Sequence, residues 1–320
     1  MSQKAKGTPL SIEGVIKKNL KLAYKTVRRK LPSHTEALLL LLGQQMSRQV
    51  AIAPPNESFR KVGFKVFSQW DEDGIIQYLI SHLPMQNKTF IEFGVEDYEE
   101  SNTRFLLLKD HWQGMVLDAS ESDIRFIQRD KIYWEFDLQA KCAWITRDNI
   151  NALLNGAGFS EDIGLLSIDI DGNEYWIWEA IQSLRPRIVI IEYNSLFGLK
   201  PVSVPYKENF HKLSAHYSGL YYGCSLAALH HLAKRKGYVL VGSNIWGHNA
   251  FFIRSDIPSE FKGLEPEEVY VPSTYRDSRD AAGDLTFLRG EDRMKLIEHL
   301  PVANVVTGRE SLLKECWGPE

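Results

Sequence analysis

The sequence predicts an α/β protein built on a doubly wound, mostly parallel sheet, and three observations support this. Two apolar runs, Leu165 to Ile170 and Arg187 to Tyr193, lack the alternation of a half-exposed strand and are typical of strands buried on both faces. Strand patterns alternate with helical patterns over much of the chain, which indicates parallel strands joined by helices. Finally, strands at Tyr238 to Val241 and Ala250 to Arg254 are separated by one short loop, so this last pair must be antiparallel.

The remaining elements follow in chain order. A helix after the loop that begins at Ser68 has Ile75, Ile76 and Leu79 at spacings that place them on one face. Trp176 and Ile177 begin a similar pattern after the first apolar run. The predicted strands are 89–94, 114–119, 131–136, 165–170, 187–193, 238–241 and 250–254, and the helices between them are 102–109, 121–129, 146–154, 173–182 and 225–236.

The amino end has a different character. From Ile12 to Leu31, apolar residues recur at helical intervals among seven lysines and arginines, which predicts a basic amphipathic helix. One interpretation is peripheral contact with the anionic inner face of a membrane. The other is a solvated basic face that docks on the rest of the protein. The apolar residues at 38–42 are far too few for a membrane span. We also predict no cleavable signal, because the basic region is too long and no small-residue cleavage site follows these leucines.

Composition limits the class of protein. The 320 residues, 44% apolar and 25% charged, can bury a large core, and the net charge of −3 gives no general attraction to nucleic acid. Three widely spaced cysteines favour a reducing, cytoplasmic location. We predict a helical extension at 1–64, a main domain at 65–256 and an appendage at 257–320 that serves as a lid, a homodimer element or a wrap around the main domain.

Oxygen-bearing side chains follow two neighbouring predicted strands. Asp169 and Asp171 end the first apolar run, and Glu192 and Asn194 end the second with the same spacing. The carboxyl ends of strands in open α/β sheets are where ligands bind. The two aspartates can remove a proton from a hydroxyl group or hold a divalent metal, and Glu192 and Asn194 become candidate substrate contacts. The alternative is structural, with Asp171 capping a helix and Asp169 paired to an arginine.

The loop between the last two strands adds further polar groups near the same edge of the sheet. His248 is the candidate base there, because an unperturbed imidazole titrates close to neutral pH. Asn244 and Asn249 are candidate substrate contacts. Tyr222 could supply an aromatic face for a sugar ring, and a plain core role explains it equally well.

Several segments resemble the FkbM-like group of class I methyltransferases, which use S-adenosylmethionine. The resemblance covers about Ser68 to Arg254 and rests on FIEFGVEDY, GMVLDAS, LLSIDIDGNEYW, RIVIIEYN and GYVLVGSNIWGHNAFF. It implies a seven-stranded sheet of the Rossmann-like kind, S-adenosylmethionine as cofactor, and methyl transfer that usually goes to a hydroxyl oxygen. It does not identify the acceptor.

The resemblance also assigns cofactor contacts. Glu92 and Gly94 match the acidic residue and first glycine after the first strand, and Asp118 matches the acidic residue that binds the ribose hydroxyls. Asp137 is a weaker match to a contact near the adenine. The customary second glycine is missing, since Glu96 begins the stretch in its place. Asp118 could instead cap the helix that follows it.

We therefore predict an S-adenosylmethionine-dependent O-methyltransferase that acts on a sugar, glycan or other small molecule, with a divalent metal as an optional second cofactor. One alternative is a metal-dependent glycosyltransferase, because residues 169–171 form a DxD sequence. A second alternative is a catalytically silent binding module held at a membrane by its basic amino end.

Overall fold

The computed structural model describes residues 33–317. A boundary between two compact units falls after Gln44, and the unit from Gln45 onward contains the sheets and every site residue discussed below. The helix predicted at 12–31 lies outside the described residues. The first described helix is α2 (Ser33–Val50). In the described part of the chain, no helix combines the length and the apolar character that crossing a membrane requires.

The centre of the larger unit is a seven-stranded sheet with the order β3-β2-β1-β4-β5-β8-β7. All neighbours are parallel except the pairs that involve β8. This is the class I methyltransferase fold, and it confirms the predicted mostly parallel sheet with one antiparallel hairpin. The strands are β1 (Thr89–Phe93), β2 (Gln113–Asp118), β3 (Leu138–Cys142), β4 (Leu165–Ile168), β5 (Ile188–Glu192), β7 (Tyr238–Ser243) and β8 (Asn249–Arg254).

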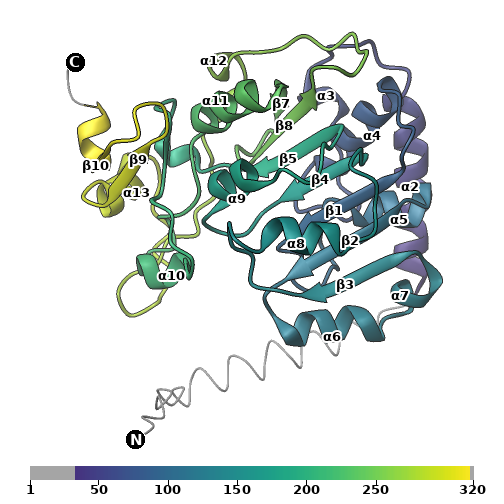
Figure 1. Ribbon diagram of the computed structural model, residues 1–320, viewed down its shortest axis with the longest axis horizontal. Coiled ribbons are helices and arrows are strands. Elements are labelled where there is room, and N and C mark those ends of the chain that lie inside the picture. The colour runs from purple at the N-terminus through teal and green to yellow at the C-terminus, as the bar shows by residue number, and fades with distance from the viewer. Residues whose placement is uncertain (1–32, 318–320) are drawn as a thin grey trace, which may run out of the picture. The chain divides into compact units, whose positions relative to one another are not determined.

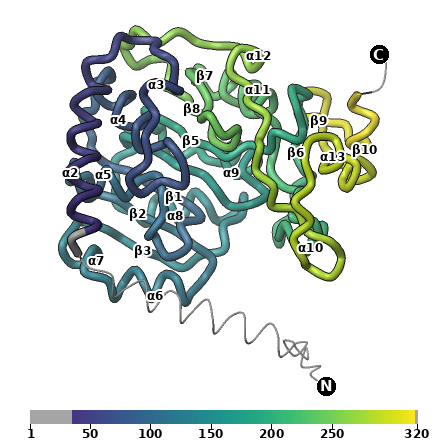
Figure 2. Tube along the Cα trace, turned by 180° about the vertical axis from the view of Figure 1, so that it is seen from behind, coloured from purple at the N-terminus to yellow at the C-terminus, as the bar shows by residue number. Residues whose placement is uncertain are grey.

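Helices cover both faces of this sheet, which explains the continuous apolar runs. Leu165 packs into the core of one face and Leu166 into the core of the other, as successive strand side chains must. Figure 1 shows the helical layer on the Leu166 face, which contains α8 (Ile150–Asn155), α9 (Glu174–Ala180) and α11 (Leu226–Lys236). Figure 2 shows the opposite layer from behind, with α3 (Phe59–Val62), α4 (Glu72–His82) and α5 (Arg104–Asp110).

The third strand was predicted wrongly. Residues 131–136 do not form a strand, because α6 (Glu121–Arg129) is followed by a second short helix, α7 (Lys131–Glu135). The Asp130 side chain caps α7 by accepting a hydrogen bond of 2.9 Å from the Ile132 amide. The strand β3 therefore starts only at Leu138. The other predicted strands agree with the observed ones to within two residues.

A second, three-stranded sheet has the order β10-β9-β6 and joins two distant parts of the chain. The strand β6 comes from the segment between β5 and α11, whereas β9 and β10 lie near the carboxyl end. Phe210 and Tyr221 of that segment share an apolar core with Ile297 and Val302. Figure 1 shows this region beside the main sheet. Its elements are η1 (Ser195–Phe197), β6 (Val202–Ser203), α10 (Lys212–Ala215), α13 (Glu291–Ile297), β9 (Pro301–Asn304), β10 (Glu310–Leu312) and η2 (Leu313–Trp317). The helix α12 (Pro266–Val269) lies instead against α11 and β7 of the main sheet.

Candidate active site

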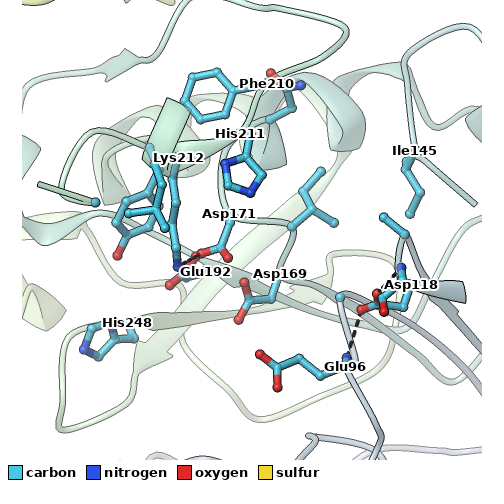
Figure 3. Close-up of a pocket in the computed structure, with 18 of the residues that line it drawn as sticks. Glu96, Asp118, Ile145, Asp169, Asp171, Glu192, Phe210, His211, Lys212 and His248 are labelled. Atoms are coloured by element: carbon cyan, nitrogen blue, oxygen red, sulfur yellow. Dashed lines mark hydrogen bonds and ion pairs between the residues drawn. The ribbon is translucent and has the colours of Figure 1, made fainter. Parts of the chain in front are cut away.

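The carboxyl ends of β1, β2, β4 and β5 open into one cavity of about 650 Å³. Figure 3 shows Asp118 and Glu96 on one side of this cavity and Asp171, Glu192, Lys212 and His248 on the other, with Asp169 between them. We call the side with Asp118 the cofactor half and the side with Glu192 the acceptor half. Most of the polar residues predicted from strand ends are thus brought together.

Gly94 makes the junction between the loops after β1 and β4. Its φ is +74°, in the left-handed region, and a Cβ atom there would lie 1.6 Å from the Asp169 carbonyl oxygen. Its amide donates a 2.9 Å hydrogen bond to the Leu117 carbonyl. Only glycine permits both the backbone angle and this contact. The position therefore fixes the floor of the cavity between β1, β2 and β4.

The loop after Gly94 reaches its turn without a second glycine. Glu96 has a φ of +46°, and Tyr98 has a φ of +62°. The Glu96 amide donates a 2.9 Å hydrogen bond to Asp118 Oδ2, and the Tyr98 ring is fully buried with its hydroxyl 3.0 Å from Thr103 Oγ1. These contacts hold two residues in a conformation that L side chains rarely adopt.

Asp118 lines the cofactor half of the cavity. Besides the bond from Glu96, its Oδ1 accepts a 2.7 Å hydrogen bond from the Ser120 amide. Burial raises the pKa of this carboxyl group, while the backbone hydrogen bonds oppose the rise. Each oxygen carries two acceptor sites, so the two backbone bonds orient the carboxylate and leave it able to accept hydroxyl donors from a ligand.

The other two predicted cofactor contacts do not line the cavity. Glu92 is buried, and its oxygens accept the Asn102 and Thr103 amides at 2.8 and 3.0 Å, so it fixes the segment before α5. Asp137 directly precedes β3 and is exposed. It lies at the amino end of that strand, opposite the cavity, because the true strand starts after it. The residues at the carboxyl end of β3 that do line the cavity are Ala143, Trp144 and Ile145.

Asp169, Asp171 and Glu192 form an acidic cluster in the acceptor half. One oxygen from each lies within 4.8 Å of the other two. Burial first, and then the charges of Asp171 and Glu174, raise the pKa of Asp169 to about 8. The pKa of Glu192 is also raised, mainly by burial and next by Asp169. The cluster therefore retains a proton near neutral pH, and Glu192 Oε2 is buried without a hydrogen-bond partner.

Two neighbours shape this cluster. Glu174 Oε1 accepts the amides of Ile170 and Gly172 at 3.1 and 2.7 Å, and thereby holds the turn in which Asp171 has a φ of +57°. Lys212 of α10 places its Nζ 2.5 Å from Asp171 Oδ1. The lysine ammonium thus stands beside the carboxylates, where it partly takes the place of a bound cation.

His248 lines the acceptor half, as predicted, but its environment disfavours the charged form. Burial lowers its pKa to about 4, with smaller contributions from the positive charges of Arg293 and Lys212. Its Nε2 lies 3.0 Å from Ser273 Oγ. A neutral imidazole at pH 7 can exchange hydrogen bonds with a ligand, while Asp169 has the pKa better suited to take up a proton near neutral pH.

Of the five predicted substrate contacts, Glu192 and Tyr222 line the cavity and the three asparagines do not. Asn194 donates to the carbonyls of Leu220 and Tyr222 at 2.9 and 3.0 Å. Asn244 and Asn249 both donate to Glu72 Oε1, at 2.7 and 2.9 Å. The side-chain amides of these asparagines therefore form buried hydrogen bonds within the protein. These bonds stabilise the insertion after β5, which is the segment between β5 and α11, and join α4 to the hairpin of β7 and β8.

The sequence did not indicate four cavity residues that come from distant segments. Trp70 precedes α4, Lys212 belongs to α10, and Tyr275 and Arg293 belong to the carboxyl-terminal part. The Trp70 ring stacks on Trp246 with centroids 4.5 Å apart, and Tyr275 meets Trp70 edge-on. No strand-end pattern marks these positions. Trp144 differs, because it follows β3 by two residues. A correct prediction of β3 would have placed Trp144 at the edge of the sheet that borders the cavity.

No family model matches the chain, and no curated protein matches its sequence. Among solved structures, an O-methyltransferase from Bacillus cereus in complex with SAH is 13% identical, with 73% of this chain and 96% of that chain covered and a TM-score of 0.36.

Two further solved structures are similar at the same level. The N-terminal domain of EvdMO1 with SAH bound is 10% identical, covering 68% and 97% of the two chains at a TM-score of 0.39. The CurJ carbon methyltransferase is 11% identical, covering 57% of this chain and 52% of that chain at a TM-score of 0.35. The chain thus spans about half the length of that last protein.

Proposed function

We propose that the chain is an S-adenosylmethionine-dependent methyltransferase that methylates a hydroxyl oxygen of a sugar, a glycan or another small molecule. The observation that carries this proposal is the single cavity in which the glycine junction at Gly94 and the oriented carboxylate of Asp118 meet the acidic cluster. One end suits a nucleoside, and the other suits a hydroxyl group that must lose a proton.

The residues of the cofactor half suit this cofactor. The Asp118 carboxylate can accept both ribose hydroxyls, and Trp144 beside it offers an aromatic surface for a base. Gly94 lets the backbone come close to the ligand. The carboxylates of Glu96 and Asp169 suit a ligand with ammonium and sulfonium charges, and they would repel a pyrophosphate. When bound, S-adenosylmethionine supplies an electrophilic methyl group.

Asp169 is the group that we assign to take up the acceptor proton. Its raised pKa makes the ionised form of Asp169 a stronger base than an ordinary aspartate, and the amount of this form increases as the pH approaches 8. Glu192 beside it can share the proton. Lys212 balances the charge of Asp171, and its positive charge favours the ionised forms of Asp169 and Glu192. The protein therefore orients the hydroxyl group and removes its proton.

The aromatic groups around the acceptor half support a sugar as acceptor. Trp70 and Tyr275 both line the cavity and meet edge-on with ring centroids 5.9 Å apart, so both rings contribute to the same wall. Sugar rings present apolar faces that pack on such rings, with hydroxyl groups at their edges for carboxylates to bind. Asp169, Asp171 and Glu192 supply those carboxylates.

Calorimetry with S-adenosylhomocysteine tests the proposal. The full chain should bind it, and Asp118→Ala should weaken binding by about 10- to 150-fold, which corresponds to a lost charge-assisted hydrogen bond of about 1.5–3 kcal/mol. Asp137→Ala, at the opposite end of the sheet, is the matched control and should leave binding unchanged.

Two outcomes would favour the alternatives. Failure to bind S-adenosylhomocysteine at millimolar concentration would favour a silent binding module. Tighter binding of a nucleotide sugar together with manganese would favour the metal-dependent glycosyltransferase, with Asp169, Asp171 and Glu192 as the metal ligands.

A further inference from the structure

Arg293 is a buried cation in the wall of the acceptor half. It belongs to α13, lines the cavity, and is only 7% exposed. Its Nε atom is buried without a hydrogen-bond partner. Its Nη1 reaches the Ser273 carbonyl at 3.5 Å, which is the limit of a hydrogen bond. A guanidinium group has five N–H donors, so most of its hydrogen-bonding capacity is unused.

In the described part of the chain, no carboxylate forms an ion pair with this guanidinium group. Among the described residues 33–317, no Asp or Glu oxygen is within 4.0 Å of the Arg293 guanidinium. Asp277, the nearby acid that also lines the cavity, is paired with Arg279 at 3.6 Å. Buried arginines are normally paired, because an isolated buried charge is costly.

Lys212 provides the contrast within the same half of the cavity. Its ammonium is matched by the Asp171 carboxylate at 2.5 Å. The positive charges of both Lys212 and Arg293 act on His248 and disfavour its protonation. Near His248, the positive charge of Lys212 is therefore neutralised by an ion pair, whereas the positive charge of Arg293 has no ion-pair partner among the described residues.

The indole of Trp70 also has an unused donor, since its Nε1 is buried without a partner. Trp70 and Arg293 come from opposite ends of the chain and line the same cavity. Unpaired donors in a buried site are satisfied when a ligand brings acceptor atoms. A carboxylate or a phosphate can accept two parallel hydrogen bonds from one guanidinium group.

We propose that Arg293 binds an acidic group of the acceptor, so that the substrate is an anionic molecule such as a sugar with a carboxylate or phosphate group. This inference rests on the proposed function and names the substrate class of the same site. The acidic group lies at the Arg293 wall, and the hydroxyl group to be methylated faces Asp169. The acceptor is thereby oriented at two points, one charged and one at the reacting oxygen.

Three sugars that differ only at C6 test the inference. D-glucose, D-glucuronate and D-glucose 6-phosphate are titrated into the full chain, with and without S-adenosylhomocysteine. We expect at least one of the two acids to bind about 10- to 150-fold more tightly than glucose, as a charge-assisted hydrogen bond implies. A better fit of glucuronate assigns a carboxylate, and a better fit of the phosphate ester assigns a phosphate.

Variants of Arg293 connect the preference to this side chain. Arg293→Met should remove the preference for the acids, whereas Arg293→Lys should keep part of it. Arg276→Met is the matched control, because Arg276 is exposed on the same part of the chain and bonds to the Phe287 carbonyl. Arg293→Met should also raise the melting temperature, because it replaces an unpaired buried charge by an apolar chain.

Two results would overturn the inference. The first is a wild-type chain that shows no preference for either acid over glucose. The second is a preference that Arg293→Met leaves intact. Binding of S-adenosylhomocysteine in the same titrations separates the two proposals: if it binds and the acids show no preference, only the inference about the acceptor fails.

Discussion

The two halves of the cavity satisfy their polar groups in opposite ways. In the cofactor half, Asp118 receives backbone amides on both oxygens, and the glycine junction at Gly94 is closely packed. In the acceptor half, Glu192 Oε2 and Arg293 Nε are buried without partners, and the pKa of Asp169 is raised to about 8. The cofactor half is thus largely preorganised by the protein alone, whereas the acceptor half reserves charges and donors for a ligand.

The strongest test of the preorganised half is Gly94→Ala. The new methyl group would lie 1.6 Å from the Asp169 carbonyl, so the ends of β1 and β4 must separate. We expect loss of measurable S-adenosylhomocysteine binding and a fall of about 3 kcal/mol or more in the free energy of unfolding. Calorimetry and urea unfolding measure the two effects.

Gly158→Ala is the matched control for that variant. Gly158 has the same φ of +74°, but a Cβ atom there would meet nothing within 4 Å. It should cost only the backbone preference of about 1 kcal/mol. Equal effects of the two substitutions would show that the close contact between Gly94 and Asp169 does not hold the site.

The second test concerns Asp169 in the acceptor half. Asp169→Asn retains the shape and removes the charge, so we expect kcat to fall by about 100- to 10,000-fold with binding of S-adenosylhomocysteine preserved. Turnover is measured as formation of S-adenosylhomocysteine from S-adenosylmethionine, with D-glucuronate or D-glucose 6-phosphate as the acceptor. A variant with full turnover and a much lower melting temperature would assign Asp169 a purely structural role.

The pH dependence of stability gives a third test. Asp169 has a folded-state pKa of about 8, above its ordinary value of 3.8, so it favours folding below pH 4 and loses that contribution as the pH rises toward 8. The wild type should lose stability over this interval. Asp169→Asn should reduce the loss by about 4 kcal/mol, measured by urea unfolding at pH 5 and pH 8.5. Identical pH profiles would show that Asp169 is ionised in the folded protein like an exposed aspartate.

The smallest expected effect concerns the cation in the acidic cluster. Lys212→Met removes the ammonium beside Asp171, which leaves three carboxylates free to hold a divalent ion. One millimolar manganese should raise the melting temperature of this variant by about 3 °C and leave the wild type unchanged. Lys65→Met, which removes an exposed lysine paired with Glu100, is the control. An equal shift in the wild type would indicate a metal site that tolerates Lys212.

In both halves of the cavity, the residues at strand ends are the ones that the sequence makes predictable. Gly94, Asp118, Asp169 and Glu192 each follow an apolar strand, and parallel strands bring their carboxyl ends together. The error at Asp137 arose because the Asp130 cap starts a helix where the residue pattern suggested a strand. Nothing local marks Lys212 or Arg293, because tertiary packing of the insertion and the carboxyl-terminal part brings them to the cavity.

A position at the end of a strand does not by itself place a side chain in the cavity. Asn194 was selected because it repeats the spacing of Asp169 and Asp171, yet its amide serves the carbonyls of the insertion. Asn244 and Asn249 likewise serve Glu72, which lies more than 170 positions earlier in the chain. The spacing of residues in the sequence predicts which side chains lie at the edge of the sheet. Which hydrogen-bond partner each polar side chain has depends on the packing of segments that are distant in the sequence.

The small sheet that joins β6 to β9 and β10 has a consequence for chimeric proteins. Tyr275 and Arg293 lie downstream of the last strand of the main sheet, while Gly94 and Asp118 lie far upstream. A swap of the carboxyl-terminal part between homologous chains would therefore exchange the wall that faces the acceptor and leave the nucleoside side untouched. The swap must include the insertion after β5, because its strand β6 is the partner of β9. We therefore expect acceptor choice to change only when both segments are exchanged together.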